Sequence, residues 1–222
     1  MQPRPKIPRP TVTRLSLYLR EIESRLEQGD ATISSQQLGE ALKLTDAQVR
    51  KDLAFFGQFG HPGVGYRLSE LAAHLRAILG TDRQWNVALV GAGRIGRALM
   101  SYQRFRAKGF EIVAVFDNDT GVVGDLVAGH RVRPLSDMPQ LFRERDIRMG
   151  IVAVPADAAQ ATADRLIEAG ALGILNFAPC VLNVGDEVSV VSVDFSTALE
   201  QLAFAVSLGL PVGLVAAPDA PE

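Results

Sequence analysis

The stretch Asn86-Val87-Ala88-Leu89-Val90-Gly91-Ala92-Gly93-Arg94-Ile95-Gly96 decides the fold of this 222-residue chain. Its first five residues form a short apolar run, typical of a strand that is buried on both faces. The remainder fits the pattern G-x-G-x-x-G. Gly91 permits a tight turn out of the strand, Gly93 lets backbone amides approach a pyrophosphate, and Gly96 lets a helix, expected over 95–108, lie close to the strand. The amides and the positive dipole end of that helix favour phosphate.

A second apolar run, Glu111–Phe116, ends at Asp117, about 20 residues beyond the last glycine of the motif. A carboxylate at this place accepts hydrogen bonds from both hydroxyls of an adenosine ribose and repels a 2′-phosphate, which favours NAD(H) over NADP(H). A glycine motif alone is weak evidence, but here strand, glycines, helix, strand and acid follow in order. The alternative is a Rossmann-like layer whose site binds nothing.

Beyond this motif, apolar strands and crossover helices continue to alternate. We expect helices over 136–145 and 157–169, and strands over 148–154, 172–177 and 188–193. This order predicts an α/β fold with a doubly wound parallel sheet. Ligands bind at the carboxyl ends of such strands, so the segments that follow two of them should border the dinucleotide. The predicted cofactor site comprises Gly91, Ala92, Gly93, Arg94, Ile95, Gly96, Asp117, Val154, Pro155, Asn176, Phe177, Ala178 and Pro179.

The first 80 residues have a different, helical pattern. Helices are expected over 11–28, 36–42 and 46–56, and Thr45 can cap the third of them. This arrangement is typical of a helix-turn-helix that reads DNA with its third helix. There, Val49, Leu53 and Phe56 can pack inward. The side chains expected to face DNA are Gln48, Arg50 and Lys51.

Residues 57–67 combine glycines and a proline with aromatic residues, which suggests a tight hairpin. Behind a recognition helix this hairpin would be the wing of a winged helix, with its thin tip in a minor groove. The alternative is a plain surface hairpin on a helical domain. The predicted DNA contacts of the wing are His61, Gly63, Gly65, Tyr66 and Arg67.

Composition narrows the class of protein. Hydrophobic residues make up 47% and charged residues 22%, as in a soluble globular protein, and neither a membrane span nor a signal peptide is expected. The single cysteine, Cys180, excludes an internal disulfide framework and suggests the reducing cytoplasm. Residues 1–85 carry 12 basic and 9 acidic side chains, and residues 86–222 carry 11 and 16, so the basic front half is the one suited to a polyanion.

Catalytic groups are not expected, because the chain lacks a Tyr-x-x-x-Lys pattern or a His-Asp dyad after its strands. His61 and His74 fall in the amino-terminal part, and His130 is expected in a surface loop. No metal site is expected either. An NAD-dependent dehydrogenase with an amino-terminal appendage and a CoA-binding or nucleotide-binding module remain the alternatives to a DNA-binding protein.

The chain resembles the Rex family of redox-sensing transcriptional repressors from about residue 8 to 208. The pieces that carry the resemblance are Leu17-Tyr18-Leu19-Arg20, Gln48-Val49-Arg50-Lys51-Asp52-Leu53, Gly63-Val64-Gly65-Tyr66, the glycine motif, Gly173-Ile174-Leu175-Asn176-Phe177-Ala178-Pro179 and Val193-Asp194-Phe195. The resemblance implies a homodimer that binds an inverted-repeat operator and releases it when NADH binds. It also implies that Arg20 can pair with Asp194, and that Phe195 and Tyr102 lie near the nicotinamide.

The resulting domain plan has five parts: a flexible arm (1–10), a winged-helix DNA-binding domain (11–80), a Rossmann NAD(H)-binding domain (81–195), a helix (196–208) and a loose tail (209–222). Asp194 caps or precedes that last helix. Its apolar residues occupy more than one face, so it should pack against something besides its own domain. The resemblance implies that this helix swaps onto the partner subunit. Cys180, near the expected cofactor, is interpreted either as a small core residue or as a second redox input.

Overall fold

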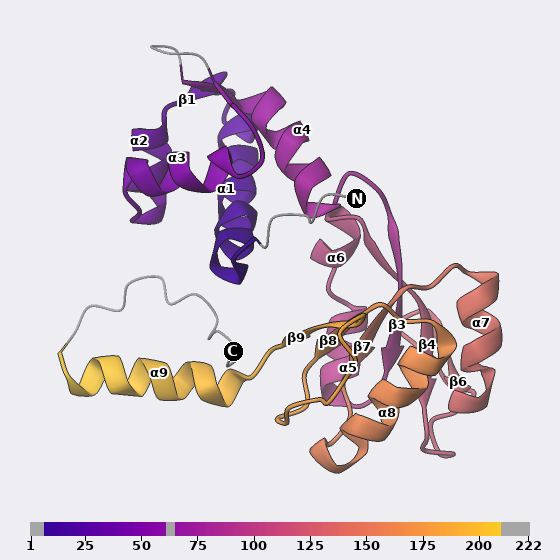
Figure 1. The fold of residues 1–222 in the computed structure, drawn as a ribbon. Coiled ribbons are helices and arrows are strands. Elements are labelled where there is room, and N and C mark those ends of the chain that lie inside the picture. Colours follow the sequence, from indigo (N-terminus) through magenta and orange to yellow (C-terminus); the bar gives the residue numbers. More distant parts are fainter. Residues whose placement is uncertain (1–6, 61–64, 210–222) are drawn as a thin grey trace. The chain divides into compact units, whose positions relative to one another are not determined.

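The structure, a computed structural model, describes residues 7–60 and 65–209. The described chain divides into two compact units (Figure 1). The first runs up to Asp82 and takes in the described residues from Glu200 on, and the second runs from Arg83 to Leu199. Within the described residues, no helix is long and apolar enough to cross a lipid bilayer.

The first unit is built mainly from helices. Leu15, Tyr18 and Ile22 form a fully buried stripe along its first helix, at the spacing of an amphipathic helix. They pack with apolar residues of the other elements into one core. The elements are α1 (Arg9–Glu27), β1 (Thr32–Ile33), α2 (Ser35–Leu42), α3 (Asp46–Ala54), β2 (Tyr66–Arg67) and α4 (Leu68–Leu79).

The turn between α2 and α3 confirms the predicted helix-turn-helix. Ser34 caps α2 with a capping box, and the Thr45 hydroxyl accepts a hydrogen bond from the backbone N–H of Gln48 at 3.1 Å to start α3. Gly39 allows the turn before α3 to lie close against α2, because a Cβ there would lie 2.7 Å from the carbonyl oxygen of Leu44. Helix α3 ends at Ala54, two residues earlier than expected.

The predicted wing hairpin is corrected in its strand pairing. Strand β2 pairs antiparallel with β1, which precedes α2, and not with the residues just before the turn. A Cβ on Gly60 would lie 2.7 Å from the carbonyl oxygen of Gly65, so the chain does return upon itself there. His61 and Gly63 lie outside the described residues.

The second unit is a seven-stranded sheet with the order β5-β6-β4-β3-β7-β8-β9. All its pairings are parallel except that of β5 with β6. Apart from β5, the strands have the 3-2-1-4-5-6 order of dinucleotide-binding folds, with the switch point between β3 and β7. The strands are β3 (Trp85–Val90), β4 (Phe110–Asp117), β5 (Leu126–Val127), β6 (His130–Pro134), β7 (Met149–Val152), β8 (Gly173–Asn176) and β9 (Ser189–Ser192).

Helices connect these strands (Figure 1). Two sequence predictions about this unit, one of a helix and one of a loop, were wrong. The helix expected over 95–108 is interrupted after Met100, where the Ser101 hydroxyl donates to the carbonyl oxygen of Arg97 at 3.2 Å and competes with the helical pattern. The expected loop around His130 is instead the β5–β6 hairpin, in which Ala128 and Gly129 both adopt positive φ. The helices are α5 (Arg94–Met100), α6 (Arg104–Ala107), η1 (Leu135–Asp137), α7 (Met138–Glu144), α8 (Ala156–Ala169) and α9 (Phe195–Ser207).

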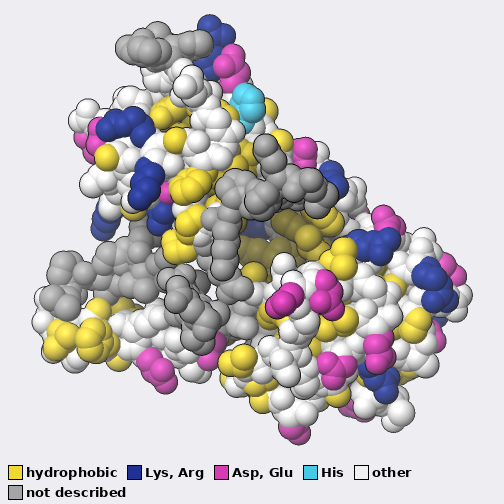
Figure 2. All heavy atoms as spheres, in the orientation of Figure 1, with side chains coloured by type: hydrophobic (Ala, Val, Ile, Leu, Met, Phe, Trp, Pro, Cys, Tyr) yellow, Lys and Arg dark blue, Asp and Glu magenta, His cyan; other side chains and the backbone are white. Residues whose placement is uncertain are grey.

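Helix α9 begins one residue before its predicted start and buries none of its residues. Phe195, Leu199, Phe204 and Val206 are each more than 60% exposed, and Figure 2 shows hydrophobic side chains gathered over this helix. The expectation that α9 needs a further packing partner therefore stays open within this single chain.

Candidate functional site

The glycine loop between β3 and α5 has the geometry that a pyrophosphate requires. Gly91 has φ of 103°, and a Cβ there would lie 2.4 Å from the carbonyl oxygen of Ala153. A Cβ on Gly96 would lie 1.9 Å from the carbonyl oxygen of Gly91, so α5 approaches the loop closely. A Cβ on Gly93 would meet nothing within 4 Å, which leaves open space over the start of α5. The loop therefore fits a phosphate group at that place.

Asp117 at the end of β4 is held against this loop by backbone N–H groups. Its Oδ2 accepts a hydrogen bond from Ala92 at 2.6 Å, and its Oδ1 accepts from Asn118 at 2.7 Å and from Asp119 at 2.9 Å. The carboxylate thus lies beside the glycine loop, where a dinucleotide fold places the acid that binds ribose.

Two further segments reach the same edge of the sheet. Val154 and Pro155 follow β7, and the segment 176–179 ends β8 and follows it. Asn176 is fully buried: its Nδ2 donates to the carbonyl oxygens of Ala178 at 3.1 Å and Cys180 at 2.9 Å, and its Oδ1 accepts from the Ala178 N–H. Its amide therefore shapes the turn after β8 and is already fully engaged.

Phe177 and Phe195 follow β8 and β9 at this edge, and Tyr102 follows α5. The rings of Phe177 and Phe195 are 6.3 Å apart, and Phe195 is 63% exposed. Tyr102 is 48% exposed and contacts the ring of Phe105 edge-on at 5.1 Å. Arg94 and Ile95 are exposed in the first turn of α5. Cys180 is half-buried and packs against the apolar core, which favours its interpretation as a small packing residue.

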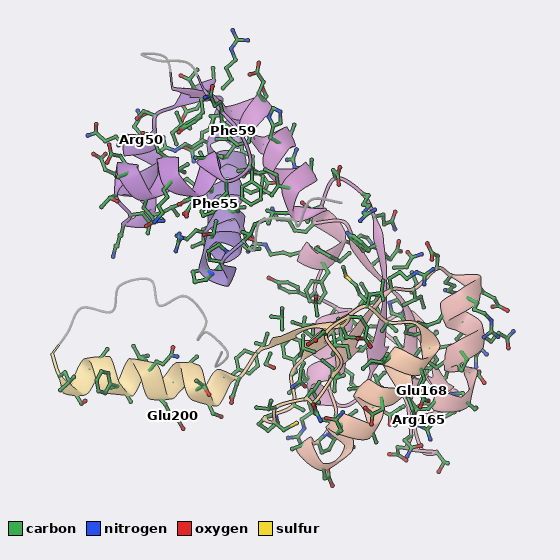
Figure 3. The ribbon with its side chains drawn as sticks, in the orientation of Figure 1. Arg50, Phe55, Phe59, Arg165, Glu168 and Glu200 are labelled. Atoms are coloured by element: carbon green, nitrogen blue, oxygen red, sulfur yellow. The ribbon has the colours of Figure 1, made fainter. Side chains whose placement is uncertain are left out.

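A cavity of about 330 Å³ lies at the ends of β4 and β6 and was not predicted from the sequence. It adjoins Asp117 and includes the guanidinium-bearing residue Arg165 of α8, which is labelled in Figure 3. Leu135 and Ser136, which follow β6, form part of its wall. The cavity is lined by Asp117, Asn118, Thr120, Val123, Pro134, Leu135, Ser136 and Arg165.

The predicted DNA-reading side chains of α3 differ in their exposure and in their hydrogen bonds to neighbouring side chains. Lys51 is exposed. Arg50 (Figure 3) donates from Nη1 to Asp46 at 2.7 Å and to the Ser35 hydroxyl at 3.1 Å. Gln48 is half-buried and donates from Nε2 to Asp52 at 2.9 Å. Of the three, only Lys51 has no side-chain hydrogen bond or ion pair within the described part of the chain.

The predicted wing residues also differ in exposure. Tyr66 is 8% exposed and packs in the core of the first unit, so it is buried and not on the surface. Arg67 is exposed and pairs with Glu70 at 3.2 Å. Gly65 has φ of 82°, and a Cβ there would lie 2.6 Å from the carbonyl oxygen of Ile33. Lys and Arg side chains are visible over this unit in Figure 2.

Asp52 is a buried carboxylate that sequence reasoning missed. It is 1% exposed and accepts hydrogen bonds from Arg14, Tyr18, Gln48 and Thr11. Burial acts to raise its pKa, but the hydrogen bonds from Arg14 and Tyr18 and the Arg14 charge outweigh burial and hold the pKa below its ordinary value. Asp52 therefore stays ionised and joins α3 to α1.

The predicted switch pair falls in different units. Arg20 is exposed on α1. Asp194 caps α9: its Oδ1 accepts from the Ser196 N–H at 2.8 Å and its Oδ2 from the Thr197 hydroxyl at 3.1 Å. These hydrogen bonds lower the pKa of Asp194. The capping role is confirmed, and the pairing with Arg20 stays a prediction.

Metal-binding clusters of His, Cys, Asp or Glu are absent from residues 7–60 and 65–209.

A helix-turn-helix unit joined to a unit that fits a dinucleotide defines a DNA-binding protein whose activity responds to a nucleotide.

Family models divide the chain in the same way. One, described as a putative DNA-binding protein N-terminus, matches residues 6–54, and another, described as a CoA binding domain, matches residues 82–180. The Redox-sensing transcriptional repressor Rex of Carboxydothermus hydrogenoformans is 49% identical over 199 residues, which cover 90% of this chain and 96% of that protein. The chain belongs to the Rex family of redox-sensing transcriptional repressors, which are not enzymes.

Crystal structures of the Rex-family repressor RSP share this fold over both units. The complex with β-NAD⁺ and operator DNA has a TM-score of 0.87 at 34% identity, covering 91% of this chain and 94% of RSP. The complex with β-NADH has a TM-score of 0.83 at 32% identity, covering 92% and 96%.

Proposed function

We propose that this chain, as a homodimer in the cytoplasm, represses transcription from an inverted-repeat operator and releases it when NADH binds. The observation that carries the proposal is the combination in one chain of a capped helix-turn-helix and a glycine loop with open space over Gly93. The RSP complexes with NADH, with NAD⁺ and with operator DNA support it.

The dinucleotide would lie along the carboxyl edge of the sheet. The amides at Gly93 and the start of α5 would receive the pyrophosphate, with Arg94 adding positive charge. Asp117 would accept the ribose hydroxyls, and the cavity beside it would take the adenosine. The segments at Val154–Pro155 and 176–179 would border the rest of the ligand.

Discrimination between the two redox forms would arise at the nicotinamide. NAD⁺ carries a positive ring and NADH a neutral one, so an apolar surround that includes Phe195 and Tyr102 disfavours NAD⁺ by desolvation. A tenfold preference corresponds to about 1.4 kcal/mol, which the loss of one charge supplies.

The sensed difference must then move the reading helices. The exposed apolar side chains of α9 would be covered by exchange of this helix with a second copy of the chain, which would hold the dimer together. NADH would close the two dinucleotide-binding units and turn the α3 helices away from the half-site spacing of about 34–36 Å.

The pairing of Arg20 with Asp194 would exist in only one of the two arrangements of the dimer. Single and double alanine variants should therefore show a non-additive loss of operator affinity in a double-mutant cycle. Simple additivity would mean that the two side chains do not form a pair.

Asp117→Ala provides the direct test of the dinucleotide site. We expect NADH binding to weaken about tenfold or more, because hydrogen bonds to a charged group contribute about 1.5–3 kcal/mol, and operator DNA to remain bound in the presence of NADH. Calorimetric titration and operator binding measure the two effects. Asp119→Ala is the matched control, since that carboxylate caps the N–H of Gly121 in the same loop. A normal NADH response in Asp117→Ala would remove this residue from the site.

The CoA-binding description of the second unit suggests one competing ligand. Asp117 would repel a phosphate on its ribose, so CoA should bind far more weakly than NADH. Titration of the purified protein with NADH and with CoA separates the two. Tighter retention of CoA would overturn the assignment.

A further inference from the structure

We propose that Asp52 is a positioning residue for base reading: it fixes the orientation of the Gln48 amide on α3 so that Gln48 recognises an adenine in the operator. The inference deepens the proposed function and rests on it, because it requires α3 to lie in the major groove.

The first step is the contact between the two side chains. Gln48 is the third residue of α3, and Asp52 follows one turn later on the same side of the helix. Nε2 of Gln48 donates to Oδ1 of Asp52 at 2.9 Å. The backbone N–H of Gln48 is bound by the Thr45 hydroxyl, so the start of the helix is fixed as well.

The second step is that Asp52 is buried and is held by hydrogen bonds from another helix. Its carboxylate is 1% exposed and accepts from Nε of Arg14 at 2.6 Å, from Nη2 of Arg14 at 2.8 Å and from the Tyr18 hydroxyl at 2.7 Å. Both donor residues belong to α1, so a second helix holds this carboxylate of α3 in place.

The third step is that the chemistry of an ionised carboxylate fixes which end of the Gln48 amide faces it. An ionised carboxylate only accepts hydrogen bonds, so it admits the nitrogen of the Gln48 amide and repels its oxygen. The amide therefore cannot turn over, and Oε1 faces away from Asp52. Among the described residues, Oε1 has no hydrogen-bond partner, and the contact with Asp52 uses only one of the two N–H groups on Nε2.

An acceptor and a donor side by side match one base edge in the major groove. Adenine offers the N6 amino group to Oε1 and the N7 acceptor to the second N–H, whereas cytosine offers an amino group alone and guanine offers two acceptors. The locked amide is thus complementary to adenine. A glutamine without the Asp52 contact would keep both orientations.

The experiment measures operator affinity with modified adenines. A full-length operator duplex is altered at one adenine of each half-site at a time, either to purine, which lacks the N6 amino group, or to 7-deazaadenine, which lacks N7. For the wild type, we expect both changes at one position to weaken binding about tenfold. Gln48→Ala should bind the natural duplex more weakly and show no further loss at that position.

Asp52→Asn separates the positioning role from simple packing. Its amide presents a donor as well as an acceptor, so Gln48 can turn over and the penalty at that adenine should largely disappear. Tyr18→Phe is the matched control, because it removes one hydrogen bond to Asp52 and leaves the Gln48 contact, so the penalty should persist. If circular dichroism finds Asp52→Asn unfolded, Gln48→Glu replaces it. That side chain cannot donate to N7, so it should lose the 7-deazaadenine penalty.

The inference fails if the wild type binds the operator but no adenine change is coupled to Gln48, or if Asp52→Asn folds and keeps the full penalty. In the Gln48→Glu arm, retention of the 7-deazaadenine penalty would also overturn it. A wild type that binds no inverted-repeat duplex would instead overturn the proposed function, and this inference with it.

Discussion

The two binding regions of this chain are built in opposite ways. The glycine loop fits a phosphate group because side chains are absent: Gly91 and Gly96 allow close backbone contacts, and Gly93 leaves open space. The reading helix α3 works through side chains that bind one another, since Arg50 is paired with Asp46 and Gln48 with Asp52. A backbone site is therefore visible as a sequence motif, whereas a side-chain site depends on partners that a motif does not show.

The sharpest test of this contrast compares two glycines of one motif. In Gly96→Ala the new Cβ would lie 1.9 Å from a backbone oxygen, so we expect the second unit to lose at least about 3 kcal/mol of stability and its NADH binding. In Gly93→Ala the Cβ meets nothing within 4 Å, so stability should be unchanged while NADH affinity falls. Urea unfolding and calorimetric titration measure the two. Equal destabilisation by both substitutions would contradict the account of the loop.

The corresponding test of the first unit removes the counter-charge of Asp52. Arg14→Ala leaves an unpaired buried carboxylate, and we expect the free energy of unfolding to fall by about 3 kcal/mol. NADH binding, carried by the other unit, should be unchanged. The control is Arg20→Ala, an exposed cation on the same helix whose loss should barely change stability. A stable Arg14→Ala protein would show that the network contributes little.

The pH dependence of unfolding should reveal the same carboxylate. The pKa of Asp52 is lower in the folded state than its ordinary value of 3.8. Its stabilisation is thus complete above that value and is lost as the pH falls through the depressed pKa. Urea unfolding between about pH 2 and 6 measures this slope. Asp52→Asn should lack this part of the pH dependence, and an identical slope in both proteins would contradict the assignment.

The smallest expected effect separates two neighbouring cations of α3. Lys51 is exposed, and Arg50 is already paired with Asp46. Lys51→Ala should reduce the salt dependence of operator binding by about one phosphate contact, and Arg50→Ala by less. NADH affinity should be unaffected in both. A larger effect of Arg50→Ala would show that its ion pair opens on DNA.

The same contrast explains what the sequence could predict. The glycine motif, Asp117 and the cap at Thr45 are local features, and the structure has them where the sequence placed them. The β5–β6 hairpin was missed because its turn uses Ala128 in a positive-φ conformation, which is a weak signal.

The Asp52 network was missed for a different reason. Asp52 follows Arg50 and Lys51 in a charged run that is typical of a solvated helix face, and its partners lie on α1, 34 to 41 residues earlier. Only the inward positions of Val49 and Leu53 indicate that this face is buried. Similarly, Tyr66 was predicted beside DNA, but its ring completes the core.

The proposed function requires that NADH, bound and chemically unchanged, releases the operator. The most direct measurement is the fluorescence anisotropy of a labelled inverted-repeat duplex with the full-length protein, at constant total NAD(H) and increasing NADH fraction. We expect DNA to be released as the NADH fraction rises and to be bound again when NAD⁺ is restored. Binding that is independent of the ratio would contradict it.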